Sequence, residues 1–211
     1  MLLDILTQSV NEFQADCLKL CEKHYPTIHN QGMSPHHLSL TFARRLARTL
    51  TEFGHSCESQ PLTLVRHGDL PHHYRVSCAQ GTVWILTQPM PSAGKSCKKR
   101  LLRDVYAWKQ EYGYAIQPND LLLLLTDHWI SRSHKSRELL HWWTGQLPDH
   151  LEEYHAQGIT LYESESQLLQ TLESLFTMTP CYIKYGHPLK HSKNQQLVRK
   201  YVQLYAVLQG G

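Results

Sequence analysis

Asp120-Leu121-Leu122-Leu123-Leu124-Leu125-Thr126-Asp127-His128 is the stretch that decides the fold. Five consecutive leucines between polar residues are typical of a strand that is buried on both faces. Leucine prefers helix, but a run of about five to seven apolar residues is short for a helix, so its length favours the strand. Because ligands of open α/β sheets collect at the carboxyl ends of such strands, we expect Asp127, His128 and Ser131 at a ligand-accessible edge.

Alternating residues predict further strands upstream of this one. Residues 74–78 and 82–87 alternate clearly and are separated by Ala79-Gln80-Gly81, which predicts an antiparallel hairpin. Weaker alternation predicts a strand at 61–66 and a short strand at 159–162. Helical spacing and capping residues predict helices at 1–24, 34–53, about 95–112, 131–143, 149–156 and from Ser164 or Ser166 to 176.

The two ends of the chain are also predicted to be helical. In the first helix, Cys17, Cys21 and His24 share one face, which could provide soft metal ligands. Packing of the thiols into a core is favoured, because no fourth ligand is evident. At the other end, helical spacing of five apolar residues predicts a final helix with one packed side, and these residues are Leu197, Tyr201, Leu204, Tyr205 and Leu208.

Length and composition indicate one α/β domain with a central mixed sheet flanked by helices. The 211 residues are 41% hydrophobic and 18% charged, with a net charge of +3. We divide them into an N-terminal helical extension (1–33), a core (34–176) and a basic C-terminal helical segment (177–211). No signal pattern and no apolar stretch of ~20 residues is present, so a soluble cytoplasmic protein with free cysteine thiols and no membrane contact is expected.

Basic residues gather in three places that could contact nucleic acid. Three arginines lie off the core stripe of the helix at 34–53, and a denser cluster opens the helix at 95–112, where positive charge opposes the helix dipole. The third place is the basic stretch at 184–200. A solvated surface is the alternative for each. The predicted nucleic-acid-binding residues are Arg44, Arg45, Arg48, Lys95, Lys98, Lys99, Arg100, Arg103, Lys190 and Lys193.

Charge is also segregated along the second half of the chain. Residues 149–173 contain six acids and no lysine or arginine, whereas residues 184–200 are basic and contain no acid. These stretches could pair between two copies of the chain, with a partner protein, or within one chain. A homo-oligomer or a protein partner is therefore expected beside possible nucleic acid.

Catalytic patterns are sparse. The sequence contains no GxSxG, P-loop, HExxH or GxGxxG motif. Asp127 and His128, with His134 and His141 on the following helix, could form a metal or acid–base site. Helix-cap and interface roles are favoured for this group, because two histidines seven residues apart suit one metal ion poorly.

The order helix, strand, hairpin, helix and buried strand from Ser34 to Leu125 resembles the restriction-endonuclease-like, or PD-(D/E)XK, nuclease superfamily. In that family an acid near the second strand and an acid-x-lysine set in the third hold Mg²⁺ and the attacking water. Here residues 82–88 contain no acid and no lysine. Asp69 could be the first acid and Lys95 a displaced lysine, but together they do not restore the metal site. The resemblance therefore implies a nuclease-like fold without activity.

Three functions follow from these features. The first is a nucleic-acid-associated accessory protein without a cofactor, which the family analogy places in a bacterial defence or mobile-element system. The second is a Mg²⁺-dependent nuclease that uses Asp69 with other acids. The third is a self-associating or partner-binding subunit that uses the segregated charges.

Overall fold

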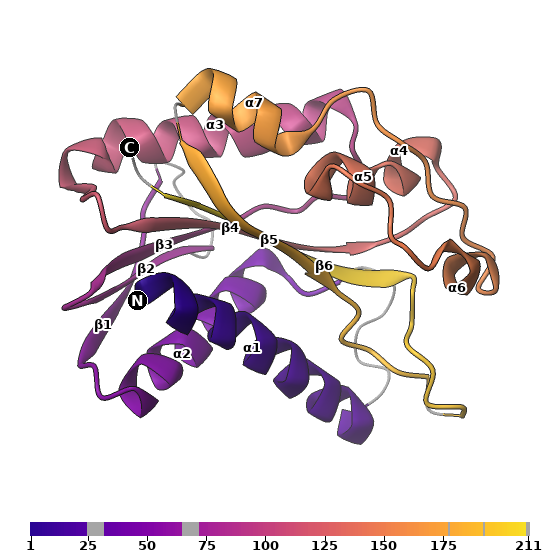
Figure 1. The fold of residues 1–211 in the computed structure, drawn as a ribbon, viewed down its shortest axis with the longest axis horizontal. Coiled ribbons are helices and arrows are strands. Elements are labelled where there is room, and N and C mark those ends of the chain that lie inside the picture. The colour runs from indigo at the N-terminus through magenta and orange to yellow at the C-terminus, as the bar shows by residue number, and fades with distance from the viewer. Residues whose placement is uncertain (25–31, 65–71, 177, 192, 210–211) are drawn as a thin grey trace.

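A mixed six-stranded sheet in the order β1-β2-β3-β4-β6-β5 forms the centre of the computed structural model, which describes residues 1–24, 32–64, 72–176, 178–191 and 193–209 (Figure 1). The strands are β1 (Cys57–Pro61), β2 (His73–Cys78), β3 (Gly81–Thr87), β4 (Leu121–Trp129), β5 (Thr179–Gly186) and β6 (Tyr201–Gln209). The helices are α1 (Leu2–His24), α2 (Pro35–Glu52), α3 (Lys95–Tyr112), α4 (His134–Arg137), α5 (Leu139–Thr144), α6 (Leu151–His155), α7 (Leu168–Phe176) and the 3-10 turn η1 (Gly113–Ala115).

The leucine run forms β4, as predicted, and occupies the middle of the sheet. It pairs in parallel with β3 from Val83↔Leu121 to Thr87↔Leu125, and antiparallel with β6 along nine residues. Asp120 fixes the start of this pairing, because its carboxylate accepts hydrogen bonds from the Thr82 N–H and the Trp84 indole N–H. The strand is therefore held on both sides and at its first residue.

The two faces of the sheet carry separate layers of helices. Leu121, Leu123 and Leu125 point into a core made with α1 and α2. Leu122 and Leu124 point into the opposite core, which α3, α5 and α7 complete. Figure 1 shows α1 and α2 below the sheet and α3 and α7 above it. Side chains alternate between the two faces along a strand. Successive residues at the end of β4 therefore face different helical layers.

The C-terminal segment is not helical, which corrects the prediction for residues 177–211. β5 and β6 form a hairpin, and β6 inserts beside β4 in the interior of the sheet. Residues 201–208 are all buried. A strand buried on both faces has no alternation, so its apolar residues matched a helical spacing by chance.

Four smaller predictions also need correction. The first helix is no extension, because Leu6, Val10 and Phe13 are buried in the core beneath the sheet. The first strand is at Cys57–Pro61, and residues 62–64, the described remainder of the predicted strand at 61–66, lie outside it. Residues 159–162 alternate in burial but pair with no described strand. The helix predicted at 131–143 is divided into α4 and α5. Within the described residues, none of the helices has the length and apolar character needed to cross a bilayer.

Candidate ligand cavity and basic face

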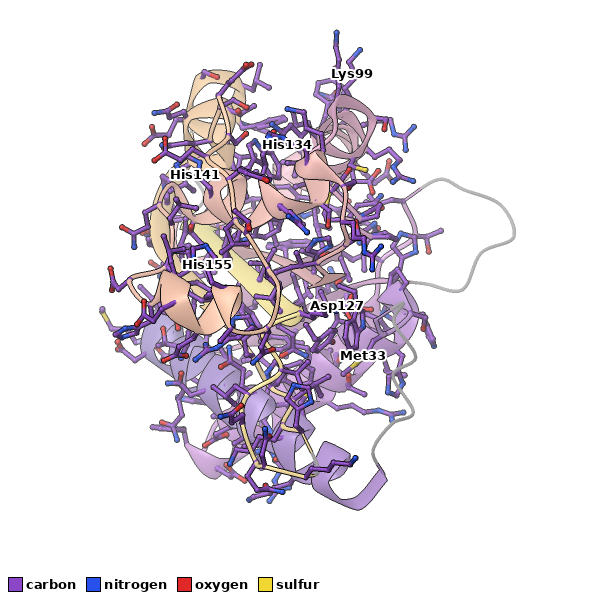
Figure 2. All side chains as sticks on the ribbon, turned by 90° about the vertical axis from the view of Figure 1, so that its right-hand side faces the viewer. Met33, Lys99, Asp127, His134, His141 and His155 are labelled. Atoms are coloured by element: carbon purple, nitrogen blue, oxygen red, sulfur yellow. The ribbon has the colours of Figure 1, made fainter. Side chains whose placement is uncertain are left out.

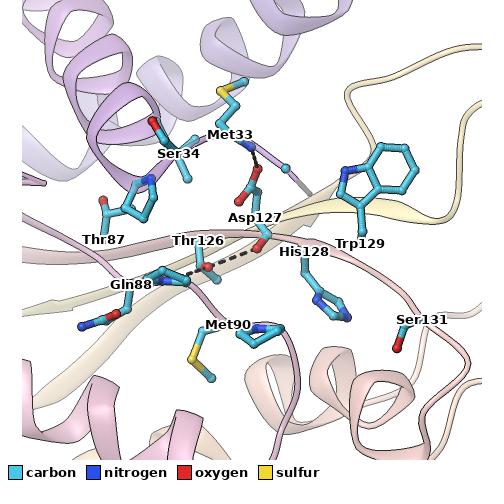
Figure 3. A pocket seen from close by; sticks show the side chains of 15 residues that line it. Met33, Ser34, Thr87, Gln88, Met90, Thr126, Asp127, His128, Trp129 and Ser131 are labelled. Carbon is cyan, nitrogen blue, oxygen red and sulfur yellow. Dashed lines mark hydrogen bonds between the residues drawn. The ribbon is translucent and has the colours of Figure 1, made fainter. Parts of the chain in front are cut away.

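A cavity of about 580 Å³ opens where β3 ends and β4 continues, at the edge that the sequence predicted (Figure 3). The β3–β4 cavity, as we call it, is lined by residues 32–35 and 38 at the start of α2, residues 87–91 after β3, and residues 126–129 and 131 at the end of β4. Its volume lies within the range of roughly 300–1,000 Å³ that is usual for small-molecule sites.

Asp127 is the charged group on the α2 side of this cavity. Its Oδ2 accepts hydrogen bonds from the Met33 N–H at 2.6 Å and from the Tyr201 hydroxyl at 2.7 Å. Burial raises the pKa of Asp127 from 3.8 to about 6, against the opposing effect of these two donors. The Gly32 backbone lies so close that an added Cβ would stand 2.6 Å from the carboxylate, so a side chain at residue 32 would displace Asp127.

His128 points to the other face of the sheet and cannot act with Asp127 on one atom of a ligand. Its Nε2 is 2.9 Å from the Ser136 hydroxyl, and burial lowers the pKa of His128 from 6.5 to about 4. The ring is therefore neutral near pH 7 and serves to hold α4 against β4. Figure 3 shows Asp127 and His128 on opposite sides of the strand.

Two residues that line the cavity, Thr87 and Trp129, each carry a buried side-chain polar atom with no hydrogen-bond partner among the described residues, namely the Thr87 hydroxyl and the Trp129 indole nitrogen. Thr87 lies on the same face of β3 as Val83 and Ile85, and Asp127 and Trp129 lie on the same face of β4 as Leu125. Because that face packs against α2, the side chains of Thr87, Asp127 and Trp129 all lie on the α2 side of the sheet. Sequence reasoning missed Thr87 and Trp129. Only the register Thr87↔Leu125 brings them to the same edge as Asp127.

A second polar group lies where β2 begins beside the end of β3. His72, His73 and Asp104 each place a ligand atom within 4.8 Å of the others. However, His73 Nδ1 accepts a hydrogen bond from the Thr87 N–H, so in the neutral ring Nε2 carries the proton and faces Asp104 Oδ2 at 3.8 Å. Gln88 Nε2 also donates to Asp104 Oδ2. This arrangement is a hydrogen-bonded network around one carboxylate, and in this ring orientation His73 Nε2 does not offer a lone pair to a metal.

The remaining catalytic candidates are not brought together in one site by the described structure. Asp69 lies outside the residues that the structure describes. Lys95 is exposed at the start of α3 and does not line the cavity. His134 stacks on Tyr162 and pairs with Glu138, while His141 Nδ1 accepts from the Ser164 N–H. The site proposed from Asp127, His128, His134 and His141 is therefore not formed.

The N-terminal thiol group is only partly visible. Cys17 is buried and accepts from Gln203 Nε2, which is consistent with core packing. The side chains of Cys21 and His24 lie outside the described part of the structure. The five cysteines with described side chains are free thiols.

Some of the predicted nucleic-acid-binding residues are already engaged within the chain. Arg45 bonds to Asp16 and Glu12 and thereby ties α2 to α1. Arg48 pairs with Glu52. Lys98 donates to the hydroxyls of Ser164 and Ser166, and its ammonium lies 5.1 Å from the centre of the Trp142 ring. Burial lowers the pKa of Lys98. Arg45 and Lys98 hold neighbouring segments together, whereas the Arg48–Glu52 pair lies within α2.

Five other cations are exposed on α3 and on the segment before α4, and we call them the basic face. They are Lys95, Lys99, Arg100 and Arg103 of α3, together with Arg132 before α4. The two segments are joined by the hydrogen bond from the Ala93 N–H to the Lys135 carbonyl. Sequence reasoning missed Arg132, although the basic run from 132 to 137 could have indicated it. Figure 2 shows Lys99 and His134 above Asp127 and Met33 in one view.

The acidic and basic stretches of the second half meet within the chain. Arg199 pairs with Glu153, and its guanidinium lies over the ring of Tyr154. Lys190 is half-buried and Lys193 is exposed between β5 and β6. At least part of the complementary charge is therefore used to join α6 to the segment that precedes β6.

No protein-family model, curated protein or solved structure matches the chain. Its function must be inferred from the chemistry of the cavity and of the basic face.

Proposed function

We propose that this protein binds nucleic acid through the basic face and has a nuclease-like core without a nuclease metal centre. The observation that carries the proposal is the basic face itself. Four exposed cations occupy the first nine residues of α3, whose first turn contains no acid. Positive charge at a helix start is unfavourable for the helix, so a bound polyanion explains the cluster better than helix stability does.

The outer surface of α3 also offers an aromatic contact. Lys95, Lys99, Arg103 and Tyr106 follow each other at spacings of four, four and three residues, which places them along one exposed stripe. Tyr106 is 57% exposed although it is a large aromatic residue. Cations that hold phosphates beside a ring that stacks on a base are the combination used to bind single strands.

The order of elements supports the nuclease-like part of the proposal. α2 precedes an antiparallel β1-β2-β3 meander, α3 crosses over, and β4 pairs in parallel with β3. Where the resemblance implies metal-binding acids and a lysine, the chain has Thr87 and Gln88 at the end of β3 and His72 and His73 at the start of β2. We therefore infer an accessory role, in which another component performs any cleavage.

The test compares a four-site variant on α3 with a two-site variant on α2, in the opposite helical layer. Replacing Lys95, Lys99, Arg100 and Arg103 with glutamine is expected to weaken binding to single-stranded DNA or RNA by about 100-fold or more at low salt, because each lost phosphate contact removes a counterion-release contribution. The control replaces two arginines, Arg44 and Arg48, which are exposed on α2 across the sheet. Equal losses in both variants would show that the binding is not located on α3.

A metal-dependent nuclease is the second candidate, and the grouping of His72, His73 and Asp104 favours it. Cleavage of plasmid or RNA in Mg²⁺ or Mn²⁺ would support this function if an Asp104→Asn variant loses the activity. The His73–Thr87 hydrogen bond leads us to expect no cleavage.

A further inference from the structure

We propose that Cys57 and Cys78 form a reversible disulfide, and that the oxidant is a low-molecular-weight disulfide such as oxidised glutathione. The two free thiols of this structure are then its reduced state. The inference goes beyond the proposed function and does not depend on it. It is carried by the register of β1 against β2, by the face on which both side chains lie and by the surroundings of the two sulfurs.

The two cysteines lie directly opposite each other on neighbouring strands. β1 is an edge strand of the sheet and pairs antiparallel with β2, and its first residue, Cys57, is the register partner of the last residue of β2, Cys78 (Figure 1). Opposite residues of an antiparallel pair place their side chains on one face. Both cysteines accordingly pack against the core between the sheet and α2. No other described cysteine has a cysteine as its register partner.

The hydrogen bonds between β1 and β2 show which kind of pair the cysteines form. Just beyond β1, the Leu62 N–H donates to the His73 carbonyl at 2.8 Å, and the register places these two residues opposite each other. Hydrogen-bonded and non-hydrogen-bonded pairs alternate along an antiparallel ladder. Since Cys57↔Cys78 lies five pairs further along, it is a non-hydrogen-bonded pair. The Cα atoms of such pairs are ~4.5 Å apart, and their side chains are closer than those of hydrogen-bonded pairs.

This spacing suits a disulfide that is easily reduced. The Cα atoms joined by disulfides are usually about 4.4–6.8 Å apart, so a separation of ~4.5 Å lies at the short end of the range. The bond can therefore form without separation of the two strands, but under strain. Strained or partly exposed disulfides are reduced more readily than relaxed ones, and transient disulfides of this kind are those found in reducing compartments.

The surroundings of the two sulfurs give them different roles. The Cys57 thiol donates to the Ala47 carbonyl of α2 at 3.5 Å, and burial raises the pKa of Cys57, so this thiol keeps its proton near neutral pH. The Cys78 sulfur instead accepts from the Gln80 N–H at 3.4 Å. Cys78 is half-buried beside the exposed turn that contains Gln80, so it can be approached from solvent. We therefore assign the first attack to the sulfur of Cys78.

The exchange takes place in two steps that need no further reactant. The Cys78 thiolate attacks one sulfur of the small disulfide, which forms a mixed disulfide and releases the first small thiol. The Cys57 sulfur then attacks the Cys78 sulfur of the mixed disulfide and releases the second small thiol. The protons of the two protein thiols end on the two released thiols. The protein is oxidised by two electrons, and the small disulfide is reduced by the same two.

The experiment incubates the native protein in mixtures of oxidised and reduced glutathione, blocks the remaining thiols with N-ethylmaleimide and maps all cysteines by mass spectrometry. In oxidised glutathione, wild-type protein is expected to lose the mass of two hydrogen atoms through a link between Cys57 and Cys78. An excess of reduced glutathione should restore both thiols. The same incubation in urea shows what the unfolded chain does.

Single variants separate the roles of the two sulfurs, and circular dichroism checks that each variant is folded. Cys57→Ser should stop at the mixed disulfide and carry one glutathione on Cys78. Cys78→Ser should carry several-fold less glutathione on Cys57, because the remaining thiol keeps its proton. Cys181→Ser is the matched control, because Cys181 is also half-buried against the same core but is not paired with a cysteine. This control should form the link between Cys57 and Cys78 as wild type does.

Wild-type protein that carries glutathione on either cysteine without a link between them, that links other cysteines instead, or that stays fully reduced would overturn the proposal. A link that forms only in urea would overturn it as well, because the link would then belong to the unfolded chain. Loss of the link in Cys181→Ser would overturn the assignment to this pair. Equal amounts of glutathione on Cys57→Ser and Cys78→Ser would overturn the assignment of the first attack to Cys78.

Discussion

Replacing Asp127 with asparagine removes a buried charge while an oxygen can still accept from Met33 and Tyr201. Burial holds the pKa of Asp127 at about 6, compared with 3.8 for an exposed aspartate. This difference corresponds to ~3 kcal/mol at 1.36 kcal/mol per pH unit. Between pH 3.8 and 6 the folded state binds more protons than the unfolded state, so Asp127 makes the protein less stable as pH rises through that window.

The Asp127→Asn variant has no carboxylate to ionise at this position, so it does not lose this stability as pH rises. We therefore expect the unfolding free energy of Asp127→Asn, relative to wild type, to increase by ~3 kcal/mol between pH 3.5 and pH 7.5. Urea denaturation followed by circular dichroism at four pH values in this range measures the difference, and the titration of the histidines cancels because both proteins contain them. A difference that stays constant or shrinks as pH rises would refute the assignment of a buried, destabilised carboxylate.

Two further predictions concern groups that stabilise the fold. Burial lowers the pKa of His187 and His128 to about 4, so the stability that depends on their neutral rings should be lost as pH falls from 6.5 through 4. The thermal unfolding midpoint of the wild-type protein should therefore fall between pH 6.5 and 4, and in His187→Gln it should fall less steeply. The same dependence of the midpoint on pH in both proteins would contradict the prediction. Arg45→Met should lower the unfolding free energy by about 1–3 kcal/mol, because it leaves Asp16 and Glu12 without their guanidinium partner. Arg48→Met, at an exposed pair, should change it by less than ~0.5 kcal/mol in the same denaturation assay, and equal effects would count against the structural role of Arg45.

Local patterns were sufficient for much of the fold. The leucine run, the hairpin of β2 and β3 and the helices α1, α2 and α3 were predicted because each has either clear periodicity or a decisive length. β6 was not, because its burial on both faces removes the alternation by which strands are identified. Its position beside β4 depends on pairing across the intervening residues 130–200, which no local pattern contains.

In the candidate site, too, some residues could be predicted from local sequence and others only from the folded structure. Asp127 and His128 were predicted at the ligand edge because that prediction needs only the end of a buried strand. The contributions of Thr87, Trp129 and Met33 depend on strand register and on the entry of the chain into α2. Likewise, sequence shows that Arg45 and Lys98 are cations, but only the packed structure shows that they bind acids and hydroxyls of neighbouring segments.

The salt dependence of nucleic-acid binding tests the central claim most directly. If the basic face contacts phosphates through its five cations, the logarithm of the association constant should fall linearly with the logarithm of salt concentration, with a slope of about −3 to −4 for a single strand. The four-site α3 variant should lose most of this slope. Wild-type protein that binds neither single-stranded DNA nor RNA at low salt, or whose binding is independent of salt, would contradict the claim.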